Sequence, residues 1–179
     1  MGFLLKVSSL IDWMNDKLGA AANWMVLGAC LISAANAMSR YAFDLSSNAW
    51  LEIQWYLFAA IVMLGASHTL RMNEHVRVDI LYTHLSERGK EWLDLLGTAI
   101  FLVPSMLVIA WYSIPFFSLS WQTQEISYNA GGLIRWPVKL LVPIGFTLVA
   151  LQGVSEIIKR AAALRGVAGY ETRYERPVQ

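Results

Sequence analysis

Side chains that could bind a cofactor or ligate a metal are few in this sequence. Its histidines are His68, His75 and His84, and its single cysteine is Cys30. A bis-histidine haem site needs imidazoles on facing helices, yet only His68 borders a long apolar stretch. One cysteine can form neither an internal disulfide nor a cysteine-based metal cluster. The sequence therefore predicts no cofactor and no metal site in this chain.

Carboxylates that could carry a proton or an ion stand only at the borders of the long apolar stretches. These border residues are Glu52, Asp94, Glu125 and Glu156. A charge at the centre of a membrane span costs about 2.5–3.5 kcal/mol on insertion scales, so acids found there mark ion or proton paths. Because no acid lies at a span centre, the sequence predicts no enzyme and, in this chain alone, no proton or sodium pathway.

The composition is that of a membrane protein. Of the 179 residues, 56% are hydrophobic and 15% are charged, against about 25% charged residues in soluble domains. Uncharged stretches cover residues 18–39, 53–70, 95–124 and 140–155, and a helix of about 17–25 apolar residues spans a bilayer. Lipid offers the backbone no hydrogen bonds, so each stretch must be helical. We therefore predict an all-α integral membrane protein with four transmembrane helices.

Charged residues also set the expected boundaries and orientation of this single membrane domain, 1–179. Eleven Lys and Arg residues fall in the N-terminal tail, the second loop and the C-terminal tail, and three fall in the other two loops. Because Lys and Arg mark cytoplasmic loops, both termini are predicted to be cytoplasmic. The net charge of +1 gives no basic field to attract nucleic acid.

The expected boundaries follow from the same residues. We expect an amphipathic helix at 1–17, transmembrane helices at 18–41, 51–71, 92–121 and 136–158, a cytoplasmic loop at 72–91, a periplasmic loop at 122–135 and a cytoplasmic tail at 159–179.

The N-terminal segment has two chemically different faces. Polar residues Lys6, Ser9, Asp12 and Asp16 share one side of a helix. This pattern predicts an amphipathic helix in the membrane interface, and the alternative is a helix packed on the soluble face of a partner. The apolar stripe on the opposite side is Phe3, Leu4, Val7, Leu10, Ile11, Met14 and Leu18.

Small residues in the first span could let another helix approach closely. Ala29, Ser33 and Ala37 recur every four residues, and small faces favour close helix packing in membranes. They form either a docking face for a larger subunit or a contact within this bundle.

Glu52 stands at a predicted helix start, where a carboxylate meets the positive end of the helix dipole. Pairing with Arg40 or with a partner remains the alternative for Glu52.

The second outer loop and the tryptophans complete the candidate contacts. Glu125 and Arg135 flank the pair Gly131–Gly132, so this loop is either a contact for a periplasmic partner or a plain connector. Tryptophan concentrates at membrane–water interfaces, and six of the eight in this chain are expected to serve as interfacial anchors. These anchors are Trp13, Trp50, Trp55, Trp92, Trp121 and Trp136.

Several runs resemble the small, DctQ-type membrane subunit of TRAP transporters. The first runs from Trp50 to Phe58 (WLEIQWYLF) and is followed by Arg71 and then by His75 to Leu81 (HVRVDIL). Another runs from Gly132 to Phe146 (GLIRWPVKLLVPIGF). Their order along a chain with four predicted spans strengthens the resemblance.

The resemblance implies a non-catalytic subunit in the bacterial inner membrane. It implies a large permease subunit that holds the substrate and sodium sites, and a periplasmic binding protein that delivers an organic acid or similar solute. This chain would brace the large subunit and contact lipid. Two other classes stay open on the residues alone, namely a membrane anchor of a respiratory complex and a free-standing four-span scaffold.

Overall fold

The computed structural model describes residues 2–45, 47–73 and 85–166. Four of its helices are long and apolar enough to cross a membrane, which confirms the predicted fold class. The part of the chain that the structure describes contains no strand, only an isolated antiparallel bridge between Ile126 and Ile134. The elements are α1 (Gly2–Phe43), α2 (Asn48–Met72), α4 (Glu87–Gly97), the π-helical turn η1 (Thr98–Leu102), α5 (Val103–Gln122) and α6 (Trp136–Leu164).

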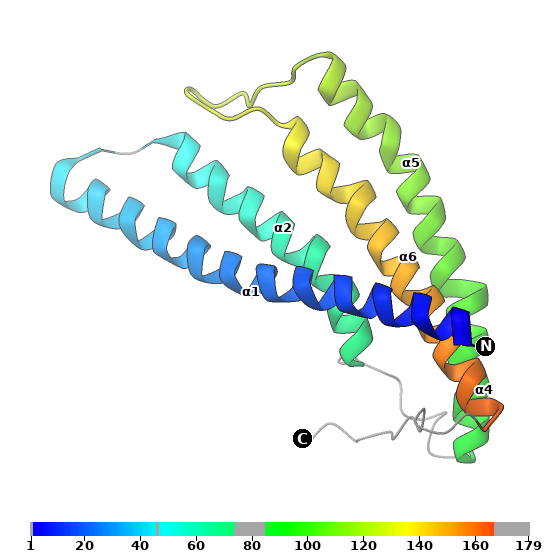
Figure 1. Ribbon diagram of the computed structural model, residues 1–179. Helices are drawn as coiled ribbons and strands as arrows, with labels where there is room; N and C mark the ends of the chain where they lie inside the picture. Colours follow the sequence, from blue (N-terminus) through cyan, green and yellow to red (C-terminus); the bar gives the residue numbers. More distant parts are fainter. Residues whose placement is uncertain (1, 46, 74–84, 167–179) are drawn as a thin grey trace.

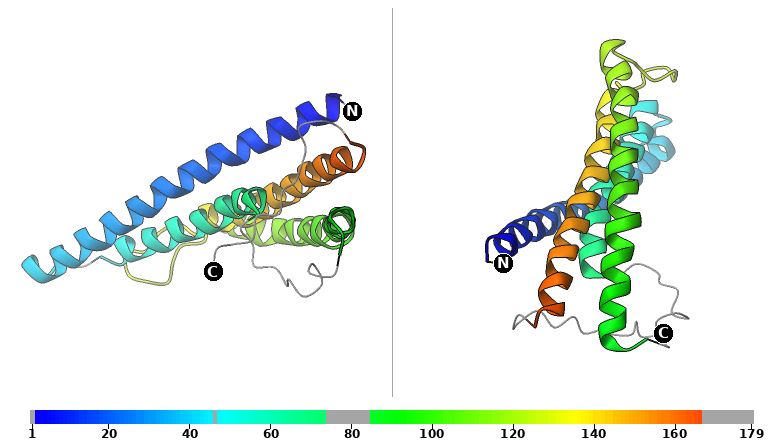
Figure 2. Two further views of the ribbon diagram at one scale, coloured as in Figure 1. Left: turned by 90° about the horizontal axis from the view of Figure 1, so that it is seen from below. Right: turned by 90° about the vertical axis from the view of Figure 1, so that its right-hand side faces the viewer.

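The helices do not form a closed square bundle. Helices α2 and α6 pack together in the middle, α1 lies along α2, and α5 lies along α6 (Figures 1 and 2). Glycines allow the close approaches. A Cβ atom built on Gly145 of α6 would lie 2.7 Å from the Cβ of Met63 on α2. A Cβ atom on Gly19 of α1 would lie 2.4 Å from the ring of His68 on α2.

Helix α1 is unbroken where the sequence analysis separated an amphipathic segment from the first span. Its 42 residues correspond to about 63 Å at about 1.5 Å per residue, twice the roughly 30 Å of a hydrocarbon core. The first half of α1 also crosses α6 (Figure 1). A helix of this length must tilt in the bilayer or extend beyond the hydrocarbon core.

Helix α1 buries a mixed face that lies between the apolar stripe and the polar side. Its buried residues are Ser8, Ile11, Asn15, Gly19 and Ala22, whereas Phe3 and Leu10 of the stripe are 77% and 64% exposed. Ser8 and Asn15 turn inward because α6 offers them hydrogen-bond partners, which lipid cannot supply. A position of the exposed part of the stripe in the membrane interface stays a prediction.

The third span is helical from Arg88 to Gln122 and contains the π turn η1. Pro104 lies two residues after the end of η1, in the first turn of α5. A proline ring clashes with the carbonyl four residues earlier in a regular α-helix, and the wider turn before it relieves that clash. The π turn lies against Gly153 of α6, where an added Cβ would be 2.8 Å from Cδ2 of Leu102.

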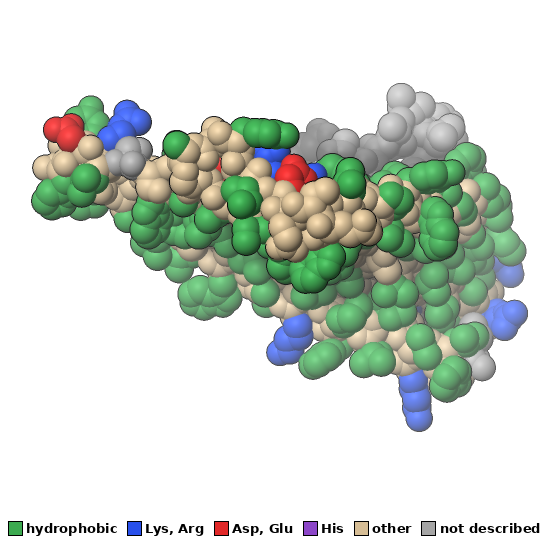
Figure 3. All heavy atoms as spheres, turned by 90° about the horizontal axis from the view of Figure 1, so that it is seen from above, with side chains coloured by type: hydrophobic (Ala, Val, Ile, Leu, Met, Phe, Trp, Pro, Cys, Tyr) green, Lys and Arg blue, Asp and Glu red, His purple; other side chains and the backbone are tan. Residues whose placement is uncertain are grey.

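Most of the outer surface is apolar. Figure 3 shows hydrophobic side chains over most of one face, with charged side chains at only a few places. Trp24 and Met38 on α1 and Trp111 and Tyr112 on α5 are each more than 70% exposed. Apolar surface of this extent suits contact with lipid or with partner helices.

Candidate functional site

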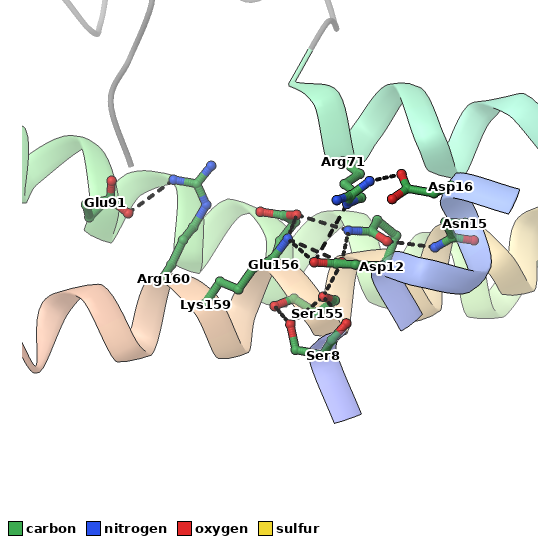
Figure 4. Close-up of polar contacts among 11 residues, drawn as sticks. Ser8, Asp12, Asn15, Asp16, Arg71, Glu91, Ser155, Glu156, Lys159 and Arg160 are labelled. Atoms are coloured by element: carbon green, nitrogen blue, oxygen red, sulfur yellow. Dashed lines mark hydrogen bonds and ion pairs between the residues drawn. The ribbon is translucent and has the colours of Figure 1, made fainter. Parts of the chain in front are cut away.

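Ten polar residues gather where α1 crosses the ends of α2 and α6, and together they form the inner polar cluster. Figure 4 shows most of them pointing toward one another from the three helices. The cluster lies beside the ends of the uncharged stretches, where the helices first carry charged side chains. Its members are Ser8, Asp12, Asn15, Asp16, His68, Arg71, Gln152, Ser155, Glu156 and Lys159.

Asp12 is the centre of this cluster. Its carboxylate accepts hydrogen bonds from the Gln152 amide at 2.9 Å and from the Ser155 hydroxyl at 2.8 Å. The Lys159 ammonium lies 3.1 Å from its second oxygen, and Lys159 also pairs with Glu156 one turn earlier on α6. A partly buried carboxylate is stable when it is paired and hydrogen-bonded in this way.

Two further contacts join α1 to α6 beside Asp12. The Asn15 amide donates to Gln152 at 2.7 Å, and the hydroxyls of Ser8 and Ser155 lie 2.7 Å apart. Ser8, Asn15, Gln152 and Ser155 are all buried. Buried polar contacts fix one register between two helices, so these four residues hold the first half of α1 on α6.

Asp16 connects the cluster to α2. It pairs with the guanidinium of Arg71, and its carboxylate lies 3.2 Å from Nδ1 of His68. Arg71 also approaches Asp12, with 3.7 Å between Nε and Oδ2. An open pocket of about 310 Å³ lies here and is lined by Ser8, Ser9, Asp12, Trp13, Asp16, Arg71 and Lys159.

A second ionic contact ties α4 to α6 at the same end of the molecule. Arg160 is buried, and its Nη1 atom lies 3.2 Å from Glu91 and 2.7 Å from Asp94 (Figure 4 shows the Glu91 contact). Burying a guanidinium between two carboxylates keeps it charged and hydrogen-bonded. The third span is thereby anchored to the fourth by charge at this end.

Glu52 organises the other end of the molecule. It is only 3% exposed, and its carboxylate accepts hydrogen bonds from the Ser127 hydroxyl, the Asn129 amide at 2.8 Å and the Leu133 backbone N–H at 2.7 Å. Residues 126–134 form a hairpin closed by the Ile126–Ile134 bridge. Glu52 therefore pins this outer hairpin to the start of α2.

Glycine makes this outer hairpin possible at two positions. Gly131 has a φ of +70°, a conformation that favours glycine. A Cβ atom on Gly132 would lie 2.5 Å from the Cβ of Ser127. A larger residue at Gly132 would push away Ser127, one of the donors to Glu52.

Glu125 forms an ionic group at the base of the outer hairpin. Its carboxylate pairs with the Lys139 ammonium and lies 3.4 Å from the Arg135 guanidinium. The hydrogen bond from Lys139 lowers the pKa of Glu125 below its ordinary value of 4.5. Next to this group, the Trp121 and Trp136 rings meet edge to face at 4.6 Å, joining the end of α5 to the start of α6.

The charged residues of the two clusters and of the outer hairpin are placed to hold helices together. They lie near the ends of the spans and contact partners on neighbouring elements. Among residues 2–45, 47–73 and 85–166, no three His, Cys, Asp or Glu side chains gather where they could hold a metal ion. Chemically, the arrangement can brace helices, and its polar pocket could bind a charged group.

Comparison with known families agrees with this architecture. Residues 29–163 match the family model of the tripartite ATP-independent periplasmic transporters, DctQ component. The chain belongs to this DctQ family. No curated protein and no solved structure gives a significant match. The DctQ match begins within α1, so Ser8, Asp12 and Asp16 of the inner polar cluster lie outside it.

The structure places the expected DctQ contact residues in two different settings. Ser33, Ala37 and Arg40 are exposed on α1, and Ala29 is half-buried. The small-residue stripe is therefore mostly outside the packing of this chain with itself. Glu52 and Glu125, by contrast, bond within the chain, and Arg135 lies beside Glu125 with its guanidinium 5.1 Å from the ring centre of Tyr128.

The expected interfacial tryptophans of this DctQ chain are mainly at the surface. Trp136 is half-buried against Trp121. Their position in a bilayer remains a prediction. The exposed tryptophans of this set are Trp13, Trp50, Trp55, Trp92 and Trp121.

The inner polar cluster was missed by the sequence analysis. A signal existed, since Ser8, Asp12 and Asn15 share one helix face, as do Gln152, Ser155 and Lys159. Residues three to four apart are neighbours on a helix, so each helix carries a matching polar stripe. That the stripes face each other depends on how α1 crosses α6. His75 and His84 lie outside the described residues.

Proposed function

We propose that this TRAP transporter component is the small, non-catalytic subunit that braces a large permease subunit during uptake of an organic acid or similar solute. The permease would hold the solute and sodium sites, and a periplasmic binding protein would deliver the solute. The complex would lie in the bacterial inner membrane, with both termini of this chain in the cytoplasm. Membership of the DctQ family supports this assembly.

One observation carries the bracing role. The charged contacts sit at the ends of the helices, whereas the exposed side chains along the middle of α1 and α5 are apolar. Trp24, Leu31 and Met38 on α1 and Leu107 and Trp111 on α5 are examples. A chain whose helices are held together at both ends and whose outer faces are apolar is suited to contact the large permease subunit on one side and lipid on the other.

Reconstitution tests the proposed role directly. Proteoliposomes would contain this chain alone, the large subunit alone, or both, with the binding protein and a sodium gradient supplied each time. We expect solute uptake only when both membrane subunits are present. Uptake by this chain alone, or full uptake by the large subunit without it, would contradict the proposal.

The exposed small-residue stripe is the proposed assembly face. Ser33→Leu should reduce co-purification with the large subunit because a bulky side chain keeps the two backbones apart. Ser33→Ala is the matched control and should assemble normally. If Ser33→Leu also assembles normally, the stripe faces lipid and the assembly face lies elsewhere, with the apolar face of α5 as the next candidate.

The outer hairpin is the proposed contact for the binding protein. Tyr128 is 91% exposed at this hairpin, so Tyr128→Ala should leave the fold intact while slowing uptake at limiting binding protein. Reversing Glu125 and Arg135 would be a poorer test, because it places a cation beside Lys139. Tyr41→Ala is the control, since Tyr41 is also 91% exposed but lies on α1. Equal uptake by Tyr128→Ala and the wild type across the titration would assign docking to the large subunit.

A further inference from the structure

The pocket of about 310 Å³ beside the inner polar cluster has mixed charge. Two carboxylates, Asp12 and Asp16, and two cations, Arg71 and Lys159, line it together with two serines. Their formal charges cancel, so the lining favours neither a simple anion nor a simple cation. A ligand that carries both signs close together would complement it best.

The four charged side chains differ in how much of each is exposed to solvent and free to bind a ligand. Asp12 and Lys159 are each 17% exposed and contact one another. Asp16 and Arg71 are more open, at 39% and 29%. A guanidinium carries five N–H donors, and the contacts to Asp16 and Asp12 involve only its Nη1 and Nε atoms. Arg71 can therefore bind an added phosphate oxygen while Asp16 accepts from an added ammonium.

The pocket lies at the depth where lipid headgroups are found. Asp16 comes just before the uncharged stretch 18–39, Arg71 directly follows the stretch 53–70, and Lys159 follows the stretch 140–155. Three helices thus change from apolar to charged at this level, and such a change marks the membrane–water interface. Trp13, which lines the pocket, is 59% exposed, as is typical of tryptophan at headgroup level.

Beyond the exposed Lys17, an apolar track continues along the same face of α1 toward the middle of the span. Trp24 and Leu27 lie about three and four helical turns beyond Trp13 on α1, close to the same face, and they are 73% and 48% exposed. A diacyl lipid whose headgroup occupied the pocket could lay a chain along these side chains. A soluble phosphate compound would gain nothing from this track.

We propose that the pocket binds the headgroup of a zwitterionic phospholipid with a primary ammonium, such as phosphatidylethanolamine. The phosphate pairs with Arg71, and the ammonium donates to Asp16 and to the hydroxyl of Ser9. The choline group of phosphatidylcholine carries no N–H donor, and phosphatidylglycerol carries no cation for Asp16. The site therefore selects phosphatidylethanolamine over both.

Native mass spectrometry of the full chain, with and without its large subunit, tests the selection. Delipidated protein would be titrated with phosphatidylethanolamine, phosphatidylcholine or phosphatidylglycerol. We expect phosphatidylethanolamine to bind about tenfold more tightly than the other two, the equivalent of one charge-assisted hydrogen bond. Equal binding of the three lipids would overturn the proposal. An excess of inorganic phosphate should displace none of the bound lipid, and displacement by phosphate alone would assign the pocket to a soluble ligand.

Two double variants separate binding from folding. Asp16→Asn with Arg71→Gln removes both proposed lipid contacts and should abolish the preference. The control, Arg40→Gln with Asp44→Asn, removes an exposed cation and anion at the other end and should keep the preference. Thermal unfolding in lipid-free detergent identifies any variant that fails to fold, and an undiminished preference in a folded Asp16→Asn, Arg71→Gln variant would overturn the proposal.

Discussion

Glu52 shows how one side chain can decide the structure of a loop 75 residues away in sequence. Its carboxylate has three donors, and all of them come from residues 127–133. A carboxylate can accept from several donors at once, so a single residue at the start of α2 replaces the strand partners that this short hairpin lacks.

Glu52→Gln should loosen the outer hairpin. The glutamine NH₂ group cannot accept, so the Asn129 amide or the Leu133 N–H loses its acceptor. We expect faster hydrogen exchange across residues 126–134 and a lower unfolding temperature. Asp44→Asn is the matched control, since it makes the same charge change at an exposed residue whose φ of 51° asparagine tolerates. Unchanged exchange in Glu52→Gln would show that the bridge and the glycine turn suffice.

Glu125 should make the base of the hairpin sensitive to acid. Its pKa in the folded protein is lowered by the hydrogen bond from Lys139, so its contribution to stability is present above the ordinary pKa of 4.5 and is lost as the pH falls through the lower folded-state value. The protection of backbone amides in residues 135–139, taken relative to the intrinsic exchange rate at each pH, should fall in that acidic range. In Glu125→Gln this fall should largely disappear, and a variant with the wild-type pH profile would assign the acid response to another group.

Helix pairs in this molecule are held by two different devices. Glycines let backbones approach where α2 and η1 meet α6, and polar side chains fix the crossing of α1 over α6. Close glycine packing is the common device of membrane helices, which lack a hydrophobic force between them. The polar contacts add register, because Asn15 and Ser8 find partners at only one relative position of α1 and α6.

Gly145→Ala should destabilise the contact between α2 and α6. The new Cβ would lie 2.7 Å from the Cβ and 2.9 Å from the backbone oxygen of Met63. Relieving the second contact requires a shift of the α2 backbone, which costs free energy. Overpacking of this kind costs about 1–3 kcal/mol. Gly28→Ala is the control, since nothing lies within 4 Å of its Cβ position, and it should leave the unfolding temperature nearly unchanged. Equal stability of the two variants would mean that the helices separate easily.

The whole molecule has a charged layer at each end and an apolar middle. The ends of α2 and α6 and the start of α4 lie toward one end, and the outer hairpin lies at the other (Figure 1). The distribution of Lys and Arg predicts that the first of these ends lies on the cytoplasmic side.

Cysteine labelling tests this orientation. In a Cys30→Ala background, Tyr128→Cys should react with an impermeant thiol reagent added outside the cell, and Lys6→Cys should react only after the membrane is opened. Both positions are exposed in the fold, so accessibility reports the side of the membrane rather than burial. Labelling of Lys6→Cys in intact cells would reverse the topology.

The sequence by itself determined the fold class, the number of spans and the family resemblance. Uncharged stretches such as 53–70 are long enough to cross a bilayer, and lipid forces the backbone of such a stretch into a helix. These are local properties, because each depends on one continuous segment and its solvent.

The tertiary structure alone decided which polar residues meet. Asp12 and Lys159 are 147 residues apart, and Glu52 and Leu133 are 81 apart. Periodicity assigns each of them to a helix face but carries no information on the angle and register at which two helices cross. For the same reason the small residues of α1 suggested a contact, while only the structure showed that Ser33 and Ala37 stay exposed. Lipid, unlike water, does not drive a whole apolar stripe inward, so the face that α1 buries combines Ser8 and Asn15 with Ile11 rather than following the stripe.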